Sequence, residues 1–155
     1  MVTQAVRVRE CEEPDLAHFE RMWAPRHAQY CREQFARGPK ALTILVSVNE
    51  SDEPTGKAHL DFEERARDRE AVLIAALVAP ELRGRGIGTE LMHESESVVC
   101  ARGYRAIVLG VEDSNPSAKR LYERLGYEEF ATDNFEYVGA PSPNPGVWMR
   151  KELEC

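Results

Sequence analysis

Six consecutive positions, Arg83 to Gly88, hold three glycines and two arginines. A few positions earlier, residues 71–78 are all apolar, which is typical of a strand covered on both faces. A buried helix is the alternative, but Pro80 and the glycines end the apolar run too early for one. From Ile87 to Gly103, apolar residues recur at helical spacing. The sequence therefore predicts a buried strand, a bare basic loop and a helix in direct succession.

A loop of this composition at the start of a helix favours an anion. The first N–H groups of a helix have no intrahelical acceptor, and the helix dipole adds partial positive charge there. The glycines let an anion approach the backbone, and Arg83 and Arg85 add formal charge. The mononucleotide motif G-x-x-x-x-G-K-[ST] does not fit, because no lysine follows Gly88. The dinucleotide motif G-x-G-x-x-G does not fit either, because its third glycine falls at Thr89. The pattern [QR]-x-x-G-x-[GA] fits fully.

A second motif follows another apolar run. Residues 115–126, Asn-Pro-Ser-Ala-Lys-Arg-Leu-Tyr-Glu-Arg-Leu-Gly, predict a short helix. Asn115 suits the N-cap, Pro116 the first helical position and Gly126 the C-terminal cap. From spacing alone, the pattern favours Tyr122 as a core tyrosine of an amphipathic helix.

The remaining segments predict an α/β fold with a mixed sheet and helices on both faces. Helical patterns cover 15–35, which Pro25 divides in two, 87–103 and 115–126. Strand patterns cover 5–9, 41–48, 57–64, 71–78, 105–111, 127–138 and 146–153. The segments 49–56 and 139–146 have the composition of turns.

The glycine loop and the Asn-to-Tyr helix, in this order, resemble the GNAT superfamily of acyl-CoA-dependent N-acyltransferases. The resemblance is strongest from Val72 to Phe130. It implies a central mixed β-sheet of 6–7 strands with about four helices on both faces, and one N-acetyltransferase domain over residues 1–155. Within that domain, residues 71–130 would form the cofactor-binding core, and the helices in 14–37 would lie on the acceptor side.

The resemblance also implies acetyl-CoA as the acyl donor and an amine as the acceptor. The residues expected to contact acetyl-CoA are Ala76, Leu77, Val78, Arg83, Gly84, Arg85, Gly86, Ile87, Gly88, Thr89 and Asn115. Tyr122 would protonate the leaving thiolate, and the N–H of Val78 would stabilise the oxyanion. Lys119 and Arg120 would either reach the remaining phosphate or form a solvated helix face.

The sequence departs from the family in the group that would deprotonate the amine. Many members carry a glutamate on the fourth strand, but 71–78 has no acid. Members that acetylate protein N-termini often have a glutamate five residues before the asparagine, where this chain has Gly110. An ordered water is one alternative. Carboxylates are the other, with candidates Asp61, Glu63, Glu64 and Glu112. A non-catalytic acyl-CoA sensor of the same fold is the alternative function. The aromatic residues Trp23, His27, Tyr30 and Phe35 either line the acceptor site or belong to the core.

Composition limits the partners. The net charge of −7 argues against a general affinity for nucleic acid or anionic membranes, and it suits a cationic acceptor such as a polyamine or an aminoglycoside. With Gly110 in place of the glutamate, we expect a small molecule as the acceptor in preference to a protein. No apolar run approaches the length of a membrane span, and the N-terminus has no signal-peptide pattern, so we expect a cytoplasmic protein. We accordingly expect all four cysteines to be reduced, and no metal site at His27 and Cys31. The resemblance adds a possible homodimer.

Overall fold

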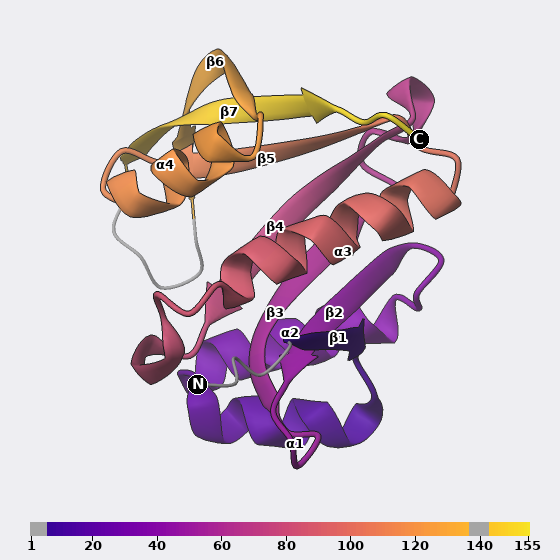
Figure 1. Ribbon diagram of the computed structural model, residues 1–155, viewed down its shortest axis with the longest axis vertical. Coiled ribbons are helices and arrows are strands. Elements are labelled where there is room, and N and C mark those ends of the chain that lie inside the picture. The colour runs from indigo at the N-terminus through magenta and orange to yellow at the C-terminus, as the bar shows by residue number, and fades with distance from the viewer. Residues whose placement is uncertain (1–5, 137–142) are drawn as a thin grey trace, which may run out of the picture.

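The computed structural model describes residues 6–136 and 143–155 and places seven strands in one mixed sheet of order β1-β2-β3-β4-β5-β7-β6 (Figure 1). The strands are Arg7–Glu10 (β1), Leu42–Val48 (β2), Pro54–Asp61 (β3), Glu70–Val78 (β4), Ala106–Glu112 (β5), Glu128–Phe135 (β6) and Asn144–Glu152 (β7). The α-helices are Glu13–Met22 (α1), Pro25–Ala36 (α2), Ile87–Ala101 (α3) and Pro116–Arg124 (α4). Two 3₁₀ turns, Ala66–Asp68 and Pro80–Leu82, flank β4. The predicted mixed sheet with helices on both faces is confirmed.

Most predicted boundaries lie within a few residues of the observed ones. The largest difference is β3, predicted at 57–64, which begins at Pro54. The Asn49 side chain accepts hydrogen bonds from the N–H groups of Ser51 and Glu53 and closes the hairpin turn early. Residue 5 of the first predicted strand, the end of 127–138 and part of the turn 139–146 lie outside the described residues.

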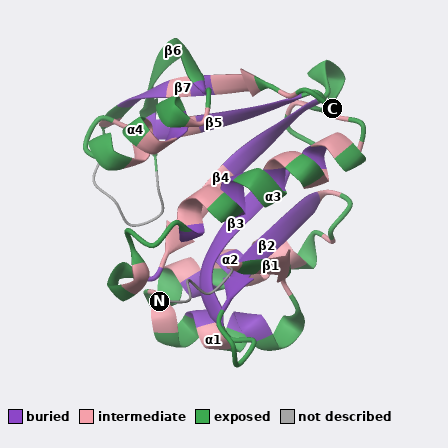
Figure 2. Cartoon of the chain, viewed as in Figure 1, coloured by how far each residue is buried: buried purple, intermediate pink, exposed green. Residues whose placement is uncertain are grey.

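Two cores cover the two faces of the sheet. Helices α1 and α2 pack on one face of β2 to β4, where Leu16 and Phe19 lie among strand residues such as Ile44. Helices α3 and α4 pack on the other face, where Leu91 and Tyr122 belong to the larger core. Figure 2 shows the central strands as the most buried part of the molecule. The sheet therefore separates an α1–α2 side from an α3–α4 side.

The two central strands pair over only part of their length. The parallel pair β4 and β5 runs from Glu70 opposite Ala106 to Leu73 opposite Leu109, and beyond this point β5 pairs only with β7. In Figure 1 the two strands lie together near the C-terminus and separate toward the loop that precedes α3. This separation leaves one edge of β4 without a partner strand from Ile74 onward.

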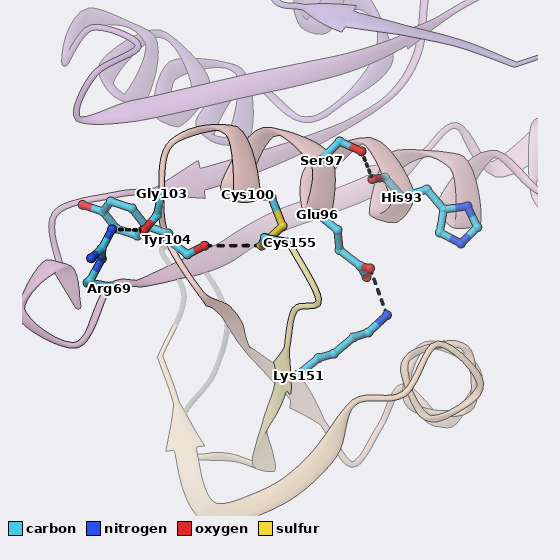
Figure 3. The surroundings of a disulfide bond; sticks show 9 residues. All are labelled: Arg69, His93, Glu96, Ser97, Cys100, Gly103, Tyr104, Lys151 and Cys155. Carbon is cyan, nitrogen blue, oxygen red and sulfur yellow. Dashed lines mark hydrogen bonds and ion pairs between the residues drawn. A yellow bond between two sulfur atoms is a disulfide. The ribbon is translucent and has the colours of Figure 1, made fainter.

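The expectation of four reduced cysteines is wrong for two of them. Cys100, in the last turn of α3, forms a disulfide with Cys155, whereas Cys11 and Cys31 are free (Figure 3). The two partners are 55 residues apart in sequence, so only the return of β7 beside β5 brings them together. An ion pair between Lys151 and Glu96, with the two atoms 2.9 Å apart, lies beside the bond. Within the described residues, no helix combines the length and the apolar character that a membrane crossing requires.

Candidate active site

A cavity of about 450 Å³ opens where β4 leaves β5, between the end of β4, the start of α3 and one face of α4. It is lined by Tyr122 and by every residue expected to contact acetyl-CoA except Arg85, which is exposed on the loop. Lys119 and Arg120 are not among the lining residues. The sequence did not single out further lining residues, although the helical spacing of α3 and α4 places most of them on the same faces. They are Leu82, Leu91, Met92, Ser117, Ala118, Leu121 and Arg124.

Left-handed backbone shapes the glycine loop. Gly84 has a φ of +78° and Gly86, the N-cap of α3, a φ of +82°. A Cβ atom at either position would meet no atom within 4 Å, so the backbone angle requires glycine here. Gly88 has a different role, because its Cβ would lie 3.4 Å from Leu121 of α4. The start of α3 thus lies within van der Waals distance of Leu121.

The backbone donors of this loop, most of whose residues line the cavity, are unpaired within the described residues. In the described part of the chain, the N–H groups of residues 84 to 89 donate to no acceptor, and the first helical bond of α3 runs from Glu90 to the Gly86 carbonyl at 3.1 Å. Successive N–H groups in such a conformation form a concave site for an anion, which the helix dipole strengthens. Arg83 lines the same cavity. The arrangement fits a diphosphate.

The ladder between β3 and β4 determines where the Val78 amide points. Ala79 N–H donates to the Thr55 carbonyl at 2.8 Å, and Gly56 lies opposite Val78. In an antiparallel ladder, the pair next to a hydrogen-bonded pair directs its N–H and C=O groups outward. The Val78 groups therefore point away from β3, toward the unpaired edge of β4. Consistent with this, Val78 O accepts a hydrogen bond from Nε of Arg83 at 3.3 Å.

Tyr122 and Asn115 hold the α4 side of the cavity. Asn115 is the N-cap, since its side-chain oxygen accepts from the Ala118 N–H at 3.3 Å. Tyr122 is 9% exposed and its ring packs edge-on against Tyr127. Burial raises the pKa of Tyr122, so its phenol stays protonated at neutral pH. Its hydroxyl makes no hydrogen bond within the described residues. Of Lys119 and Arg120, the two residues considered for the remaining phosphate, Lys119 forms an ion pair with Glu129 of β6.

The four candidate carboxylates lie at different ends of the sheet. Asp61 is opposite Val72, where β4 and β5 are still paired, and it accepts hydrogen bonds from Arg37 and from the N–H groups of Glu63 and Glu64. Burial alone would raise the pKa of Asp61, but these bonds outweigh it and lower the pKa. Glu63 is paired with Arg37 as well. Among the four, only Glu112 ends its strand at the open side, where it accepts from Ser114.

An aromatic ring occupies the place of a side chain at Gly110. A Cβ atom at Gly110 would lie 2.4 Å from the Phe135 ring, and one at Gly146 would lie 2.7 Å from it. Phe135 in turn packs against Trp148 with ring centroids 5.3 Å apart. The ring thus lies against two glycines of neighbouring strands. This explains why β5 offers no acid at this position.

The α1–α2 side holds a buried polar cluster that the sequence did not reveal. The sequence predicts a strand here and assigns no role to Lys57 or His59, but both side chains are fully buried. Trp23, His27 and Tyr30 form a chain of ring contacts that ends on His59, which stacks on Tyr30 at 5.8 Å. The other aromatic candidate, Phe35, packs against the smaller core. The apolar residues that recur at helical spacing in α1 are the feature of the sequence that indicates a helix over this face of the strand.

No group of three or more histidine, cysteine or acidic side chains suited to a metal ion occurs within residues 6–136 and 143–155. In particular, His27 lies in the aromatic chain and Cys31 packs near His59, with Sγ 3.9 Å from Nε2.

Comparisons with known proteins identify the family of this chain. The model of the acetyltransferase (GNAT) family matches residues 6–127. Mycothiol acetyltransferases of Rhodococcus jostii (strain RHA1) and Rhodococcus opacus (strain B4) are each 27% identical over 113 residues. These matches cover 72% of this chain but 37% of each relative, so the chain spans well under half the length of these curated proteins.

Solved structures share the fold at low sequence identity. A phosphinothricin acetyltransferase from Sinorhizobium meliloti, in complex with AcCoA, has a TM-score of 0.81 at 19% identity, over 97% of this chain and 89% of that one. The ribosomal-protein-S18-alanine N-acetyltransferase from Escherichia coli has a TM-score of 0.77 at 19% identity, over 97% and 96%. A spermidine N-acetyltransferase from Vibrio cholerae, in complex with CoA and spermine, has a TM-score of 0.78 at 18% identity, over 95% of each chain.

Proposed function

Because the chain belongs to the GNAT acetyltransferase family, we propose that it transfers an acetyl group from acetyl-CoA to a primary amine by direct attack in a ternary complex. The observation that carries the proposal is the cavity itself. It combines unpaired N–H groups at the start of α3, an unpaired strand edge and a protonated tyrosine. Residues 71–130 contribute its walls, and the helices within 14–37 would form the acceptor side.

The diphosphate of acetyl-CoA would bind the N–H groups of residues 84 to 89, with Arg83 adding charge. The thiol-bearing arm would then extend along Ala76, Leu77 and Val78, which line the cavity and have no partner strand on that side. This would bring the thioester carbonyl close to the outward N–H of Val78. Holding both reactants in one site replaces a bimolecular encounter and supplies much of the rate.

The reaction then needs three events at this end of the sheet. The amine nitrogen forms a bond to the thioester carbon, and the negative charge that develops on the carbonyl oxygen is stabilised by the Val78 N–H. The carbon–sulfur bond breaks, and Tyr122 donates its phenolic proton to the departing sulfur. Burial keeps the pKa of Tyr122 high, so the proton is present when it is needed. The amine loses its own proton to water or to Glu112.

We infer a small cationic amine as the acceptor, in preference to a protein N-terminus. The net charge of −7 attracts cations. The glutamate common in members that modify protein N-termini is absent, and Phe135 occupies its place over Gly110. A structure of the same fold was solved with CoA and spermine. Polyamines are therefore the first acceptors to test.

Calorimetry with acetyl-CoA, followed by a panel of polyamines and other primary amines with free thiol as the readout, tests the proposal. Binding with acceptor-dependent thiol release supports an enzyme. Binding without release from any amine would point to the non-catalytic acyl-CoA sensor instead. The absence of binding at millimolar acetyl-CoA would reject both functions.

Tyr122→Phe separates the chemistry from the binding. The substitution removes one hydroxyl that no described residue hydrogen-bonds. We expect the dissociation constant of acetyl-CoA to stay within about twofold and kcat to fall roughly 100-fold, which is in the range for loss of a general acid. An unchanged kcat would rule out the general-acid role while leaving the transferase function intact.

A further inference from the structure

Lys57 is a lysine on β3 whose side chain is fully buried, with 0% relative exposure. Its ammonium lies 3.0 Å from the Ala75 carbonyl, 3.0 Å from Nε2 of His59 and 5.4 Å from the centroid of the Trp23 ring. The neighbours of the ammonium are thus a carbonyl, an imidazole nitrogen and an aromatic ring, and the Cys31 thiol lies beside it as well. No carboxylate forms an ion pair with it in the described part of the chain. A buried charge without a counter-ion is costly to keep, so a specific role is expected for it.

The first of these acceptors belongs to an irregularity in β4. The ladder between β3 and β4 shifts by one residue between Lys57, opposite Leu77, and His59, opposite Ile74. The extra residue lies at Ala75, which has a φ of +51° although it carries a Cβ atom. A β-bulge of this kind bends its strand and leaves the bulged residue outside the ladder. The Ala75 carbonyl therefore needs another donor, and Lys57 supplies it.

The bulge determines which way the following residues face. Ile74, before the bulge, packs with the core on the α1–α2 side, whereas Ala76 and Val78, after it, pack with the core on the α3–α4 side. The bulge also coincides with the point at which β4 leaves β5, since the last paired residue is Leu73. The position of the cavity wall thus depends on the conformation of Ala75.

We propose that Lys57 is a positioning residue for acetyl-CoA, which acts from the opposite face of the sheet by holding the Ala75 bulge and so aiming the backbone of residues 76–78 into the cavity. It does not contact either substrate. The inference rests on the proposed function for the identity of the ligand, but the contact between Lys57 and Ala75 can be tested without any ligand.

The chain offers a direct probe of this contact. Ala75 and Ala76 form the single Ala-Ala sequence in the protein. Labelling alanine with ¹³C at the carbonyl and ¹⁵N at the amide gives one carbon–nitrogen cross-peak, from the Ala75 carbonyl to the Ala76 nitrogen. Carbon detection keeps this signal visible at high pH. We expect the peak to move in Lys57→Met, a substitution of similar size that removes the donors, and to stay in place in Cys31→Ala.

Cys31→Ala is a matched control because Cys31 is buried beside Lys57 and His59 in the same cluster, and its removal leaves the hydrogen bond between the ammonium and the Ala75 carbonyl in place. Both variants remove a buried side chain's polar atom, so a general loss of packing would affect both. With acetyl-CoA, we expect the dissociation constant to rise roughly tenfold in Lys57→Met and to remain unchanged in Cys31→Ala. In Lys57→Met, KM for acetyl-CoA should rise together with the dissociation constant, whereas kcat should fall by a smaller factor.

The unsubstituted protein provides a test if Lys57→Met does not fold. Burial lowers the pKa of Lys57 to about 8. Raising the pH from 7 to 10 should therefore weaken the charged hydrogen bond and shift the Ala75 peak with a midpoint near that value. The other titratable groups facing Lys57 are His59 on β3, His27 and Cys31 on α2, and Cys11 before α1. His59 and His27 have lowered pKa values and Cys11 and Cys31 raised ones, so the histidines titrate below this range.

The outcomes separate the two hypotheses. A peak that moves, together with weaker acetyl-CoA binding in Lys57→Met alone, supports the positioning role. A peak that stays in place in the variant and across the titration would overturn it, even if the protein proves to be an acetyltransferase. Unchanged acetyl-CoA affinity in a folded Lys57→Met would overturn it as well. Failure of the unsubstituted protein to bind acetyl-CoA would refute the proposed function, whereas the peak would still report on the contact.

Discussion

Two segments with left-handed backbone line the same cavity, and they are built in different ways. In the loop before α3, glycine takes each positive φ, at Gly84 and Gly86, with open space around both. In β4, an alanine takes it, and a buried lysine on the neighbouring strand hydrogen-bonds the carbonyl. The loop conformation is available to the chain locally, whereas the bulge exists only in the folded sheet. Their difference shows that one binding surface can combine local and tertiary determinants.

Gly86→Val should disrupt the glycine loop, whose conformation is determined locally, and it should produce the largest effect. A β-branched residue at a φ of +82° is strained, and the loop must change conformation to relieve it. The N–H groups of residues 84 to 89 would no longer converge. We expect acetyl-CoA affinity to fall by at least about 100-fold in calorimetry, since several charge-assisted hydrogen bonds are lost together.

Gly38→Val is the matched control for this substitution. Gly38 follows α2, has a φ of +85°, has no atom within 4 Å of a built Cβ and does not line the cavity. Both variants should lose about 1–3 kcal/mol of unfolding free energy, but Gly38→Val should bind acetyl-CoA normally. Equal binding losses in both would show that the effect is one of global stability.

The same distinction explains what could be predicted from the sequence. The strand–loop–helix unit and the Asn115 cap depend on neighbouring residues, so their place in the fold followed from composition and spacing. Lys57 was not singled out because nothing in the neighbouring sequence marks it, and only the packing of α1 and α2 buries it. The Cys100–Cys155 bond was missed for a similar reason, because its partners meet only when β7 returns beside β5. The bulge at Ala75 leaves no trace in an apolar run without glycine.

The pH dependence of the unfolding free energy tests the burial of Lys57, the residue that supports the bulge in β4. Burial lowers the pKa of Lys57 from 10.5 to about 8, so in this range the unfolded chain binds more protons than the folded one. Stability therefore increases as the pH rises from about 8 toward 10.5. Over this range the unfolding free energy should rise by roughly 3 kcal/mol, because each unit of pKa shift corresponds to about 1.4 kcal/mol.

Urea unfolding between pH 7 and pH 10 measures this contribution as the difference between the unsubstituted protein and Lys57→Met. The unfolding free energy of the unsubstituted protein should rise relative to that of the variant across the range. Lys40→Met, which replaces an exposed lysine, should leave the slope as it is. Parallel curves for the unsubstituted protein and Lys57→Met would mean that Lys57 is not desolvated as the structure has it.

Ala75→Gly should have the smallest effect, and its size relative to a neighbour is the informative quantity. Glycine relieves the positive φ at Ala75, which gains about 1 kcal/mol, but it also loses roughly 0.4–1 kcal/mol through the greater freedom of the unfolded chain. The two contributions nearly cancel. At Ala76, which is not among the residues with positive φ, only the loss applies, so Ala76→Gly should cost about 1 kcal/mol. Urea unfolding of the two variants measures the difference. If both substitutions cost the same, Ala75 is not held against its backbone preference, and the contrast between the glycine loop and the supported bulge does not exist.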